Sequence, residues 1–440
     1  MDLGLLTLII VFSMAVLLVM GLPLAFVTGA VAVTVGLVKF GPVVLGLIAS
    51  RIYSFMNEYV LVAVPMFILM ASLMERTGVA RDLYRAMHVW AGGLRGGLAV
   101  QTLFVAIIMA AMTGIIGGEI VLLGMIALPE MLRLGYNKNI AIGTICAGGS
   151  LGTMIPPSVV LIIYGLTANV AIGDLFLATI IPAFVLAGLY LFYIIVRCNI
   201  DPELGPPAPA EERQMTVVEK LALFKNLILP LMVAGCVLGS IYTGIASVSE
   251  AAGMGVVGTL VAALARKELK WQVVRASILQ TLNTCGMLLW LTFGATALIG
   301  VYNLMGGMQF VQSAVTGLDL APVFVILVMM GILVLMGLFM DWVGILLLTV
   351  PIFVPIVVSL GYDPVWFGVL FCMNMQVSYL SPPFGPAAFY LKGVAPPEIS
   401  LQDIFVGVWP FIILQLIGLG VILTFPEIAL WLPELVYGNK

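Results

Sequence analysis

The chain has 440 residues, of which 62% are hydrophobic and only 9% are charged. A soluble domain carries about 25% charged residues, so this composition excludes a soluble globular protein and indicates a polytopic membrane protein. The formal net charge of −3 comes from residues scattered over several loops, which gives no indication of a nucleic-acid partner. The five cysteines show no paired spacing, so neither a disulfide framework nor a metal site is predicted.

Residues 1–95 are predicted to form scaffold spans followed by an interfacial arm. Spans are expected near 3–19, 22–39 and 60–75. The first of them lacks the basic leader of a signal peptide, and we expect it to be retained. Residues 77–95 carry too many charges to cross a bilayer and are predicted to form a helix in the membrane interface. The single histidine, His88, falls in this arm, where a surface or interface position is expected.

Residues 96–172 are predicted to form the first half of a transport domain. The segment 96–132 starts and finishes beside basic residues of one membrane side and is too long for one span. It is predicted to be a re-entrant hairpin with its tip at Thr113–Glu119. The next span, 139–167, contains the sequence GGSLGTMIPPS. A Pro pair removes backbone donors and clashes with the preceding turn, so this span is predicted to be broken.

Residues 173–319 are predicted to return the chain to the scaffold. A polar, Pro-rich linker is expected over 200–222. Spans are expected near 173–196, 223–241, 247–265 and 278–300. Residues 303–319 contain no Lys or Arg and are predicted to form a second interfacial arm, on the external side.

Residues 320–392 are predicted to form the second half of the transport domain. A second hairpin is expected over 321–360, with its tip at the sequence MGLFMDW. The broken span 364–391 follows and contains the sequence NMQVSYLSPPFG. Residues 393–440 are predicted to hold a final span near 404–425 and an external C-terminus.

The Lys and Arg residues give the predicted orientation. Basic residues concentrate on the cytoplasmic side of membrane proteins. The predicted spans place 15 of the 18 Lys and Arg residues on one side and leave only Lys39, Arg51 and Lys440 on the other. Both termini are therefore predicted to be external, which is periplasmic if the membrane is the bacterial inner membrane.

The two halves are related by an internal repeat. At a constant offset of 226 residues, Pro and Gly–Tyr positions of the first half recur in the second. The matched positions are Pro129 with Pro355, Gly135–Tyr136 with Gly361–Tyr362, Pro156–Pro157 with Pro382–Pro383, and Tyr164 with Tyr390. Each half has an odd number of full crossings, so the halves are predicted to be inverted. Interrupted spans in corresponding positions of two halves point to a transporter's binding site.

Two hairpin tips and two breaks are expected to meet near the bilayer midplane. A broken helix exposes carbonyl oxygens and hydroxyls that suit Na⁺, and N–H groups whose positive helix end suits an anion. The predicted Na⁺ ligands are Thr113, Gly114, Gly148, Ser150, Thr153, Gly337, Asp341, Asn374 and Ser378. The predicted substrate contacts are Gly117, Gly118, Ser158, Ser381 and Gly385, and Gln376 is a further oxygen donor.

Two acidic residues, Glu119 and Asp341, fall at the predicted tips. A carboxylate at bilayer depth costs about 2.5–3.5 kcal/mol or more, so each has either a functional role or a capping or packing role. Glu58 and Glu250 lie nearer to span ends, where capping or solvent exposure is expected. No Lys or Arg occurs in 96–132, 139–196 or 276–391. An anionic substrate would therefore be held by helix N-termini, hydroxyls and bound cations.

Several long runs of the sequence resemble the large membrane subunit of tripartite ATP-independent periplasmic (TRAP) transporters. They include VPMFILMASLMERTGVARDL, GYNKNIAIGTICAGGSLGTMIPPSVVLIIYG and MDWVGILLLTVPIFVPIVVSLGYDPVWFG. The resemblance implies an elevator mechanism, Na⁺ coupling, a separate small membrane subunit of about four spans and a periplasmic substrate-binding protein. It also implies Na⁺ sites around 113–118, 148–156, 337–341 and 374–385. The first tip, TGIIGGE, departs from the Ser/Ala-rich tip of many relatives.

These observations predict an all-α inverted-repeat elevator transporter of the bacterial inner membrane. Its expected function is Na⁺-coupled uptake of a small organic acid of the carboxylate class, without an organic cofactor. A Na⁺/divalent-anion symporter that needs no binding protein is the alternative of similar architecture. A membrane-embedded hydrolase is disfavoured because the sequence has one histidine and no HExxH or GxSxG motif.

Overall fold

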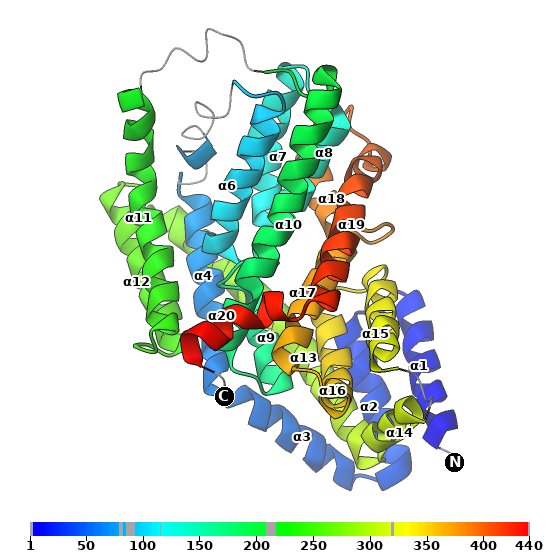
Figure 1. The fold of residues 1–440 in the computed structure, drawn as a ribbon. Coiled ribbons are helices and arrows are strands. Elements are labelled where there is room, and N and C mark those ends of the chain that lie inside the picture. The colour runs from blue at the N-terminus through cyan, green and yellow to red at the C-terminus, as the bar shows by residue number, and fades with distance from the viewer. Residues whose placement is uncertain are drawn as a thin grey trace.

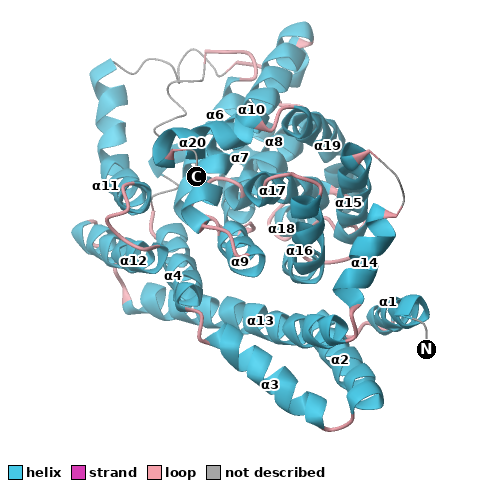
Figure 2. Ribbon diagram, turned by 60° about the horizontal axis from the view of Figure 1, so that its bottom comes forward, coloured by secondary structure: helices cyan, strands magenta, loops and turns pink. Residues whose placement is uncertain are grey.

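The computed structural model describes residues 3–78, 82–84, 93–114, 116–207, 217–317 and 321–438. Every regular element in these ranges is a helix (Figure 2). Six are long and apolar enough to cross a membrane: Tyr59–Arg76, Ile172–Ile200, Val248–Ala265, Trp271–Leu304, Trp342–Ser359 and Leu401–Thr424. The predicted polytopic helical membrane protein is therefore confirmed.

One group of helices, called the scaffold below, is built around the longest helix, α13 (Trp271–Leu304). It packs along α2 and α4, and Figure 2 shows α13, α2 and α3 side by side. At Gly294 a Cβ atom would lie within 3.0 Å of Ala25 O, so glycine allows α13 to approach the α2 backbone closely. The other members are α1 (Leu3–Val19), α2 (Leu24–Phe40), α3 (Val43–Met56), η1 (Tyr59–Val62), α4 (Ala63–Arg76), α11 (Val217–Tyr242), α12 (Val248–Ala265) and α14 (Gly307–Thr316).

The second group contains two helical hairpins and two broken helices, as predicted. Hairpin 1 consists of α6 (Gly97–Thr113) and α7 (Gly118–Arg133), and hairpin 2 of α15 (Pro322–Gly337) and α16 (Trp342–Ser359). Break 1 denotes residues 148–158, where α8 (Lys138–Ser150) passes through η2 (Leu151–Thr153) to α9 (Val159–Ala168). Break 2 denotes residues 374–385, where α17 (Pro364–Leu380) gives way to α18 (Pro386–Lys392). In Figure 1, α6 and α7 occupy the upper part of the molecule, and α16 lies in the lower part.

Two further helices, α10 (Ile172–Ile200) and α19 (Leu401–Thr424), pack against the broken helices. The rings of Tyr190 and Phe411 lie 5.4 Å apart between these two helices. Trp366 of α17 donates a 3.0 Å hydrogen bond to the carbonyl of Ile422 in α19. This packing associates α10 with the hairpins, whereas the sequence grouped residues 173–319 as scaffold. The division into fixed and mobile parts stays a prediction.

Several boundaries differ from those expected. The external stretch around Arg51 is helical, as α3, and α20 (Glu427–Tyr437) follows the final span. Both are short and interrupted by polar or Pro residues, so neither has the length of a span. The predicted linker 200–222 is shorter, because α11 begins at Val217. The arm at 303–319 contains α14, whereas most of the predicted arm at 77–95, with His88, lies outside the described residues.

Basic residues of several helix ends lie at one end of the fold. The end of α7, the start of α8 and the end of α10, which carry Arg133, Lys138 and Arg197, lie at the top of Figure 1. The helix α3, with Arg51, lies at the bottom, and the labels of both chain ends lie in the lower half. The first and last described helices, α1 and α20, thus lie toward the face opposite these basic residues, and the periplasmic position of the termini stays a prediction.

Candidate functional site

A cavity of about 380 Å³ lies between the scaffold and the hairpin tips. One wall comes from the second group: the tip of hairpin 1, Thr153 of break 1, Asp341 of hairpin 2 and Tyr390 of α18. The opposite wall comes from α4 and α13 and includes Glu75 and Gln280. Among the described lining residues there is no Lys or Arg. The structure therefore brings both tips and both broken helices to one cavity.

Glycines shape the tip of hairpin 1. Gly114 has a φ of +65° and Gly117 a φ of +120°, a region that favours glycine. A Cβ atom at Gly114 would lie within 3.0 Å of Pro157 O, and Val159 N donates a 3.3 Å hydrogen bond to Gly114 O. A Cβ at Gly117 would lie 3.1 Å from the Tyr390 ring. The tip thus rests on break 1 and touches α18 beyond break 2.

Glu119 is fully buried in the first turn of α7. Its Oε1 is hydrogen-bonded to the hydroxyl of Thr113, and Met109 O, 3.1 Å from the Thr113 oxygen, is an alternative acceptor for that single hydroxyl hydrogen. Its Oε2 has no hydrogen-bond partner among the described residues. A Cβ at Gly152 would lie 2.7 Å from Oε2, so the carboxylate rests against break 1. Glu119 does not cap α7, and its free oxygen is suited to a cation.

Asp341 has the other role that the sequence left open for a tip acid. It is the N-cap of α16, and its Oδ2 accepts a 3.2 Å hydrogen bond from Val343 N. An acid at this position is stabilised by the positive end of the helix. Its carboxylate also lines the cavity. Asp341 therefore combines capping with a place in the site.

The hydroxyls of break 1 donate to backbone carbonyls. Ser150 donates to Ala147 O at 2.8 Å, Thr153 to Ser150 O at 3.1 Å, and Ser158 to Thr153 O at 2.5 Å. A hydroxyl that donates its only hydrogen still has oxygen lone pairs for a cation. Ser158 is also the N-cap of α9, which gives it a structural role.

Break 2 carries two unpaired amide oxygens. Asn374 donates to Met330 O at 3.0 Å, and Gln376 donates to the Thr153 hydroxyl at 2.8 Å. Asn374 Oδ1 and Gln376 Oε1 are buried without a hydrogen-bond partner in the described ranges. At Gly337 a Cβ would lie within 3.0 Å of Ser378 Oγ, so hairpin 2 presses on this break. Buried polar atoms are normally paired, and unpaired ones call for a ligand or water.

The other predicted site residues are less central. Gly148 packs against Ala106 of α6, and its carbonyl accepts the Leu151 N–H that ends α8. Ser381 donates to Val377 O at 2.7 Å. Of the predicted substrate contacts, Gly117 and Gly118 line the cavity, and Ser158, Ser381 and Gly385 do not. Of the predicted Na⁺ ligands, Gly114, Thr153 and Asp341 line it, and the residues that lie outside the lining are Thr113, Gly148, Ser150, Gly337, Asn374 and Ser378.

The scaffold wall holds residues that the sequence did not single out. Gln280 Oε1 accepts hydrogen bonds from Ser72 Oγ at 2.9 Å and from Arg76 Nη2 at 2.8 Å. Glu75 lines the cavity one residue from Arg76. In the sequence, the indication for Glu75 and Gln280 is that both are polar residues near the ends of otherwise apolar predicted spans. Glu250, in contrast, forms the expected capping box with Ser247.

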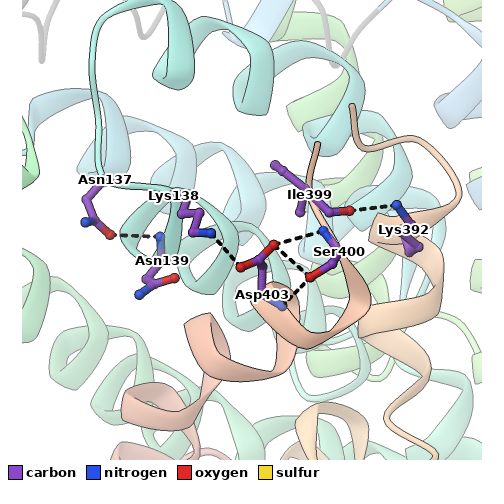
Figure 3. A network of polar contacts seen from close by, with 7 residues as sticks. All are labelled: Asn137, Lys138, Asn139, Lys392, Ile399, Ser400 and Asp403. Atoms are coloured by element: carbon purple, nitrogen blue, oxygen red, sulfur yellow. Dashed lines mark hydrogen bonds and ion pairs between the residues drawn. The ribbon is translucent and has the colours of Figure 1, made fainter. Parts of the chain in front are cut away.

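Lys392, the cation nearest to the second break in sequence, is used elsewhere. Its Nζ donates to Ile399 O at 2.6 Å, as Figure 3 shows. In the same region Lys138 pairs with Asp403 at 2.5 Å, joining the starts of α8 and α19. This polar network therefore ties the ends of the broken helices to α19.

Comparison with known proteins decides the family. The model of the "Tripartite ATP-independent periplasmic transporter, DctM component" matches residues 11–428. The chain belongs to this TRAP transporter family. It is thus a multi-pass membrane permease of a secondary solute-uptake system, one component of a tripartite transporter, and not an enzyme.

Named relatives cover nearly the whole chain. The C4-dicarboxylate TRAP transporter large permease protein DctM of Vibrio cholerae is 28% identical over 96% of both chains. The ectoine/5-hydroxyectoine TRAP transporter large permease protein UehC of Ruegeria pomeroyi is 29% identical, covering 98% of this chain and 99% of its own. The crystal structure of the Alcanivorax borkumensis YdaH transporter has a similar fold, with a TM-score of 0.66 and 16% identity over 93% of this chain and 98% of that one.

Proposed function

We propose that this permease carries out Na⁺-coupled uptake of a small organic acid of the carboxylate class by an elevator mechanism. The observation that carries the proposal is the cavity between scaffold and hairpin tips, with buried unpaired oxygens of Glu119, Asn374 and Gln376 in the elements behind it. Oxygen atoms are the ligands that hard cations prefer. Na⁺ bound there would offset the charge of an anionic substrate.

We propose two Na⁺ positions, each supported by oxygen atoms that a hairpin and a break bring together. The first lies between hairpin 1 and break 1, with Glu119 Oε2 and the hydroxyls of Thr113 and Thr153 as donors. The second lies between hairpin 2 and break 2, with Asn374 Oδ1 and Ser378 Oγ as donors. In both positions a hairpin supplies one side and a break the other. Ion binding would therefore close the hairpins on the breaks.

The substrate is proposed to bind in the cavity with its carboxylate toward the first turn of α7. The backbone N–H groups there have no intrahelical acceptor, and the helix end is positive. The cavity lining supplies no Lys or Arg among its described residues. The hairpin group would then slide along α13 and α4 and carry substrate and Na⁺ to the other face.

The partners are proposed to be a periplasmic substrate-binding protein and a separate small membrane subunit of about four spans. A relative named as a large permease matches over 96% of this chain and 96% of its own length, which supports a small subunit on a separate chain. We place the complex in the bacterial inner membrane with both termini of this chain in the periplasm, in line with the basic residues at the opposite face.

Uptake into proteoliposomes that contain both membrane subunits tests the function. We expect uptake to require the added binding protein and to stop when Na⁺ is replaced by K⁺. Uptake that is unchanged in K⁺ would overturn the Na⁺ coupling. Uptake that proceeds without the binding protein would favour the Na⁺/divalent-anion symporter of similar architecture.

A further inference from the structure

We propose that Glu75 of the scaffold is an anionic placeholder on hairpin 1. In the cavity without substrate, its carboxylate takes the place of the substrate's anionic group at the first turn of α7 and holds the hairpin group at this level of the scaffold. The inference rests on the proposed sliding of that group. It adds a contact that favours one of the two end positions of the hairpin group along the scaffold when no substrate is bound.

The contact lies at Gly118, the first residue of α7. A Cβ atom built there would lie 2.7 Å from Glu75 Oε2 and closer still to Oε1. Any side chain at this position would displace the carboxylate. Glycine is thus needed at residue 118 because a carboxylate from another segment covers its open side.

The start of α7 has no cap of its own. Its N-cap, Gly117, has no side chain, and the first N–H groups of a helix lack intrahelical acceptors. Within the first turn, Glu119 turns toward Thr113 and break 1 instead. Apart from the chain neighbours, the three atoms nearest to a Cβ at Gly118 all belong to the carboxylate of Glu75 in α4, across the boundary between scaffold and hairpins.

Glu75 projects from a part of the scaffold that side-chain hydrogen bonds hold together. Gln280 of α13 accepts hydrogen bonds from Ser72 and Arg76, which flank Glu75 in the last turn of α4. Arg76 Nε also donates to Ser72 Oγ at 3.4 Å. This network ties α4 to α13, so the carboxylate is held in place before the hairpin docks on it.

The arrangement makes docking and substrate binding compete. A substrate carboxylate directed at the α7 N-terminus would meet the like charge of Glu75 at the same helix end. Like charges at close range repel, most strongly where water is scarce. Substrate binding would thus weaken the contact between scaffold and hairpin and free the hairpin group to move.

The distance between scaffold and hairpin group tests the placeholder. Spin labels at Tyr53→Cys on α3 and Phe425→Cys at the end of α19 report that distance in the two-subunit membrane complex, with Cys236 and Cys285 replaced by Ser. Both label sites are exposed, by 70% and 56%. The measurement is made in Na⁺ without substrate or binding protein.

We expect Glu75→Gln to lower the ratio of the population at the docked distance to that at the undocked distance by about 2- to 30-fold, the range for an anion at a helix N-terminus. Gly118→Ala should act similarly, and adding it to Glu75→Ala should change little more, because the clash partner is gone. The matched control Glu58→Gln, an acid at the other end of the same segment, should leave the ratio unchanged.

Two outcomes would overturn the inference in distinguishable ways. If the wild-type complex shows two distances whose ratio is the same in Glu75→Gln and Gly118→Ala, the placeholder is wrong and the sliding mechanism stands. If the wild-type complex shows a single distance with and without Na⁺, and also with binding protein and its ligand, the sliding mechanism is wrong and the placeholder with it.

Discussion

The side-chain amide of Gln376, at the end of α17 in break 2, donates a 2.8 Å hydrogen bond to the hydroxyl of Thr153 in break 1. These residues are 223 positions apart in the chain, and both are buried. The bond joins the two inverted halves directly at the breaks. Ion binding that orders one break would therefore also affect the position of the other break.

Replacing Gln376 by Leu should destabilise the complex by about 0.5–1.5 kcal/mol, because it removes one buried hydrogen bond while the Thr153 hydroxyl keeps its bond to Ser150 O. Thermal unfolding of the purified two-subunit complex measures the loss. The effects of Gln376→Leu and Thr153→Val should be strongly non-additive, since each removes the same bond. Additive effects would show that the two side chains stabilise the fold independently.

Gly337→Ala should abolish most transport. The new methyl group would collide with Ser378 Oγ and force hairpin 2 away from break 2, and overpacking of this kind costs about 1–3 kcal/mol. Gly331→Ala on the same helix is the matched control, because nothing lies within 4 Å of a Cβ there. Ser378→Gly should restore part of the fold stability of Gly337→Ala in a thermal unfolding assay. No recovery would indicate another cause.

Asn374→Ala should raise the Na⁺ concentration for half-maximal uptake by about tenfold, which corresponds to about 1.4 kcal/mol for one lost oxygen ligand. Asn199→Ala is the control, since that exposed amide bonds only within α10. Uptake at graded Na⁺ in proteoliposomes gives the value. A Na⁺ dependence that stays put in Asn374→Ala, with normal expression, would make this residue structural.

Glu119→Gln should also raise the Na⁺ requirement, because it keeps the contact with Thr113 but removes the charge that faces break 1. Gly152→Ala should give a similar defect by filling the space beside Oε2. The control is Glu130→Gln on the same helix, where the acid pairs with Arg133 at the surface. Wild-type Na⁺ dependence in both Glu119→Gln and Gly152→Ala would exclude a cation at this carboxylate.

The Lys138–Asp403 pair should contribute little by charge alone. Lys138 is 51% exposed, and solvent screens the attraction between exposed charges. Asp403→Asn should cost more than Lys138→Met, because Asp403 also completes the capping box at the start of α19. Thermal unfolding at low and high salt separates the contribution of the ion pair, which salt screens, from that of the capping box. Equal losses for both variants would contradict the capping role.

The hairpins and breaks could be predicted because their signals are local or repeated. Pro156–Pro157 and Pro382–Pro383 interrupt apolar segments, and the offset of 226 residues pairs them. The predicted tips agree with the ends of α6, α7, α15 and α16 within a few residues. Charge asymmetry also predicted which segments lie in the membrane interface, and that assignment stays a prediction.

The scaffold side of the site could not be found this way. Glu75 and Gln280 are far apart in the chain and have no counterpart in the hairpin motifs, so only packing brings them to the cavity. For a related reason, Gly148 of break 1 is a Na⁺ ligand predicted from the sequence, whereas Gly152 is not among the predicted ligands. Which glycine of break 1 faces a carboxylate depends on the rotation of the helix, and Gly148 faces α6 instead.

The most direct test of the account is the movement of Na⁺ with the substrate. Proteoliposomes that hold both membrane subunits are supplied with loaded binding protein, and entry of ²²Na⁺ and of labelled substrate is followed together. We predict that substrate addition starts ²²Na⁺ entry, that an inward Na⁺ gradient drives substrate accumulation, and that Asn374→Ala weakens both. Substrate accumulation with no accompanying ²²Na⁺ entry would contradict the account.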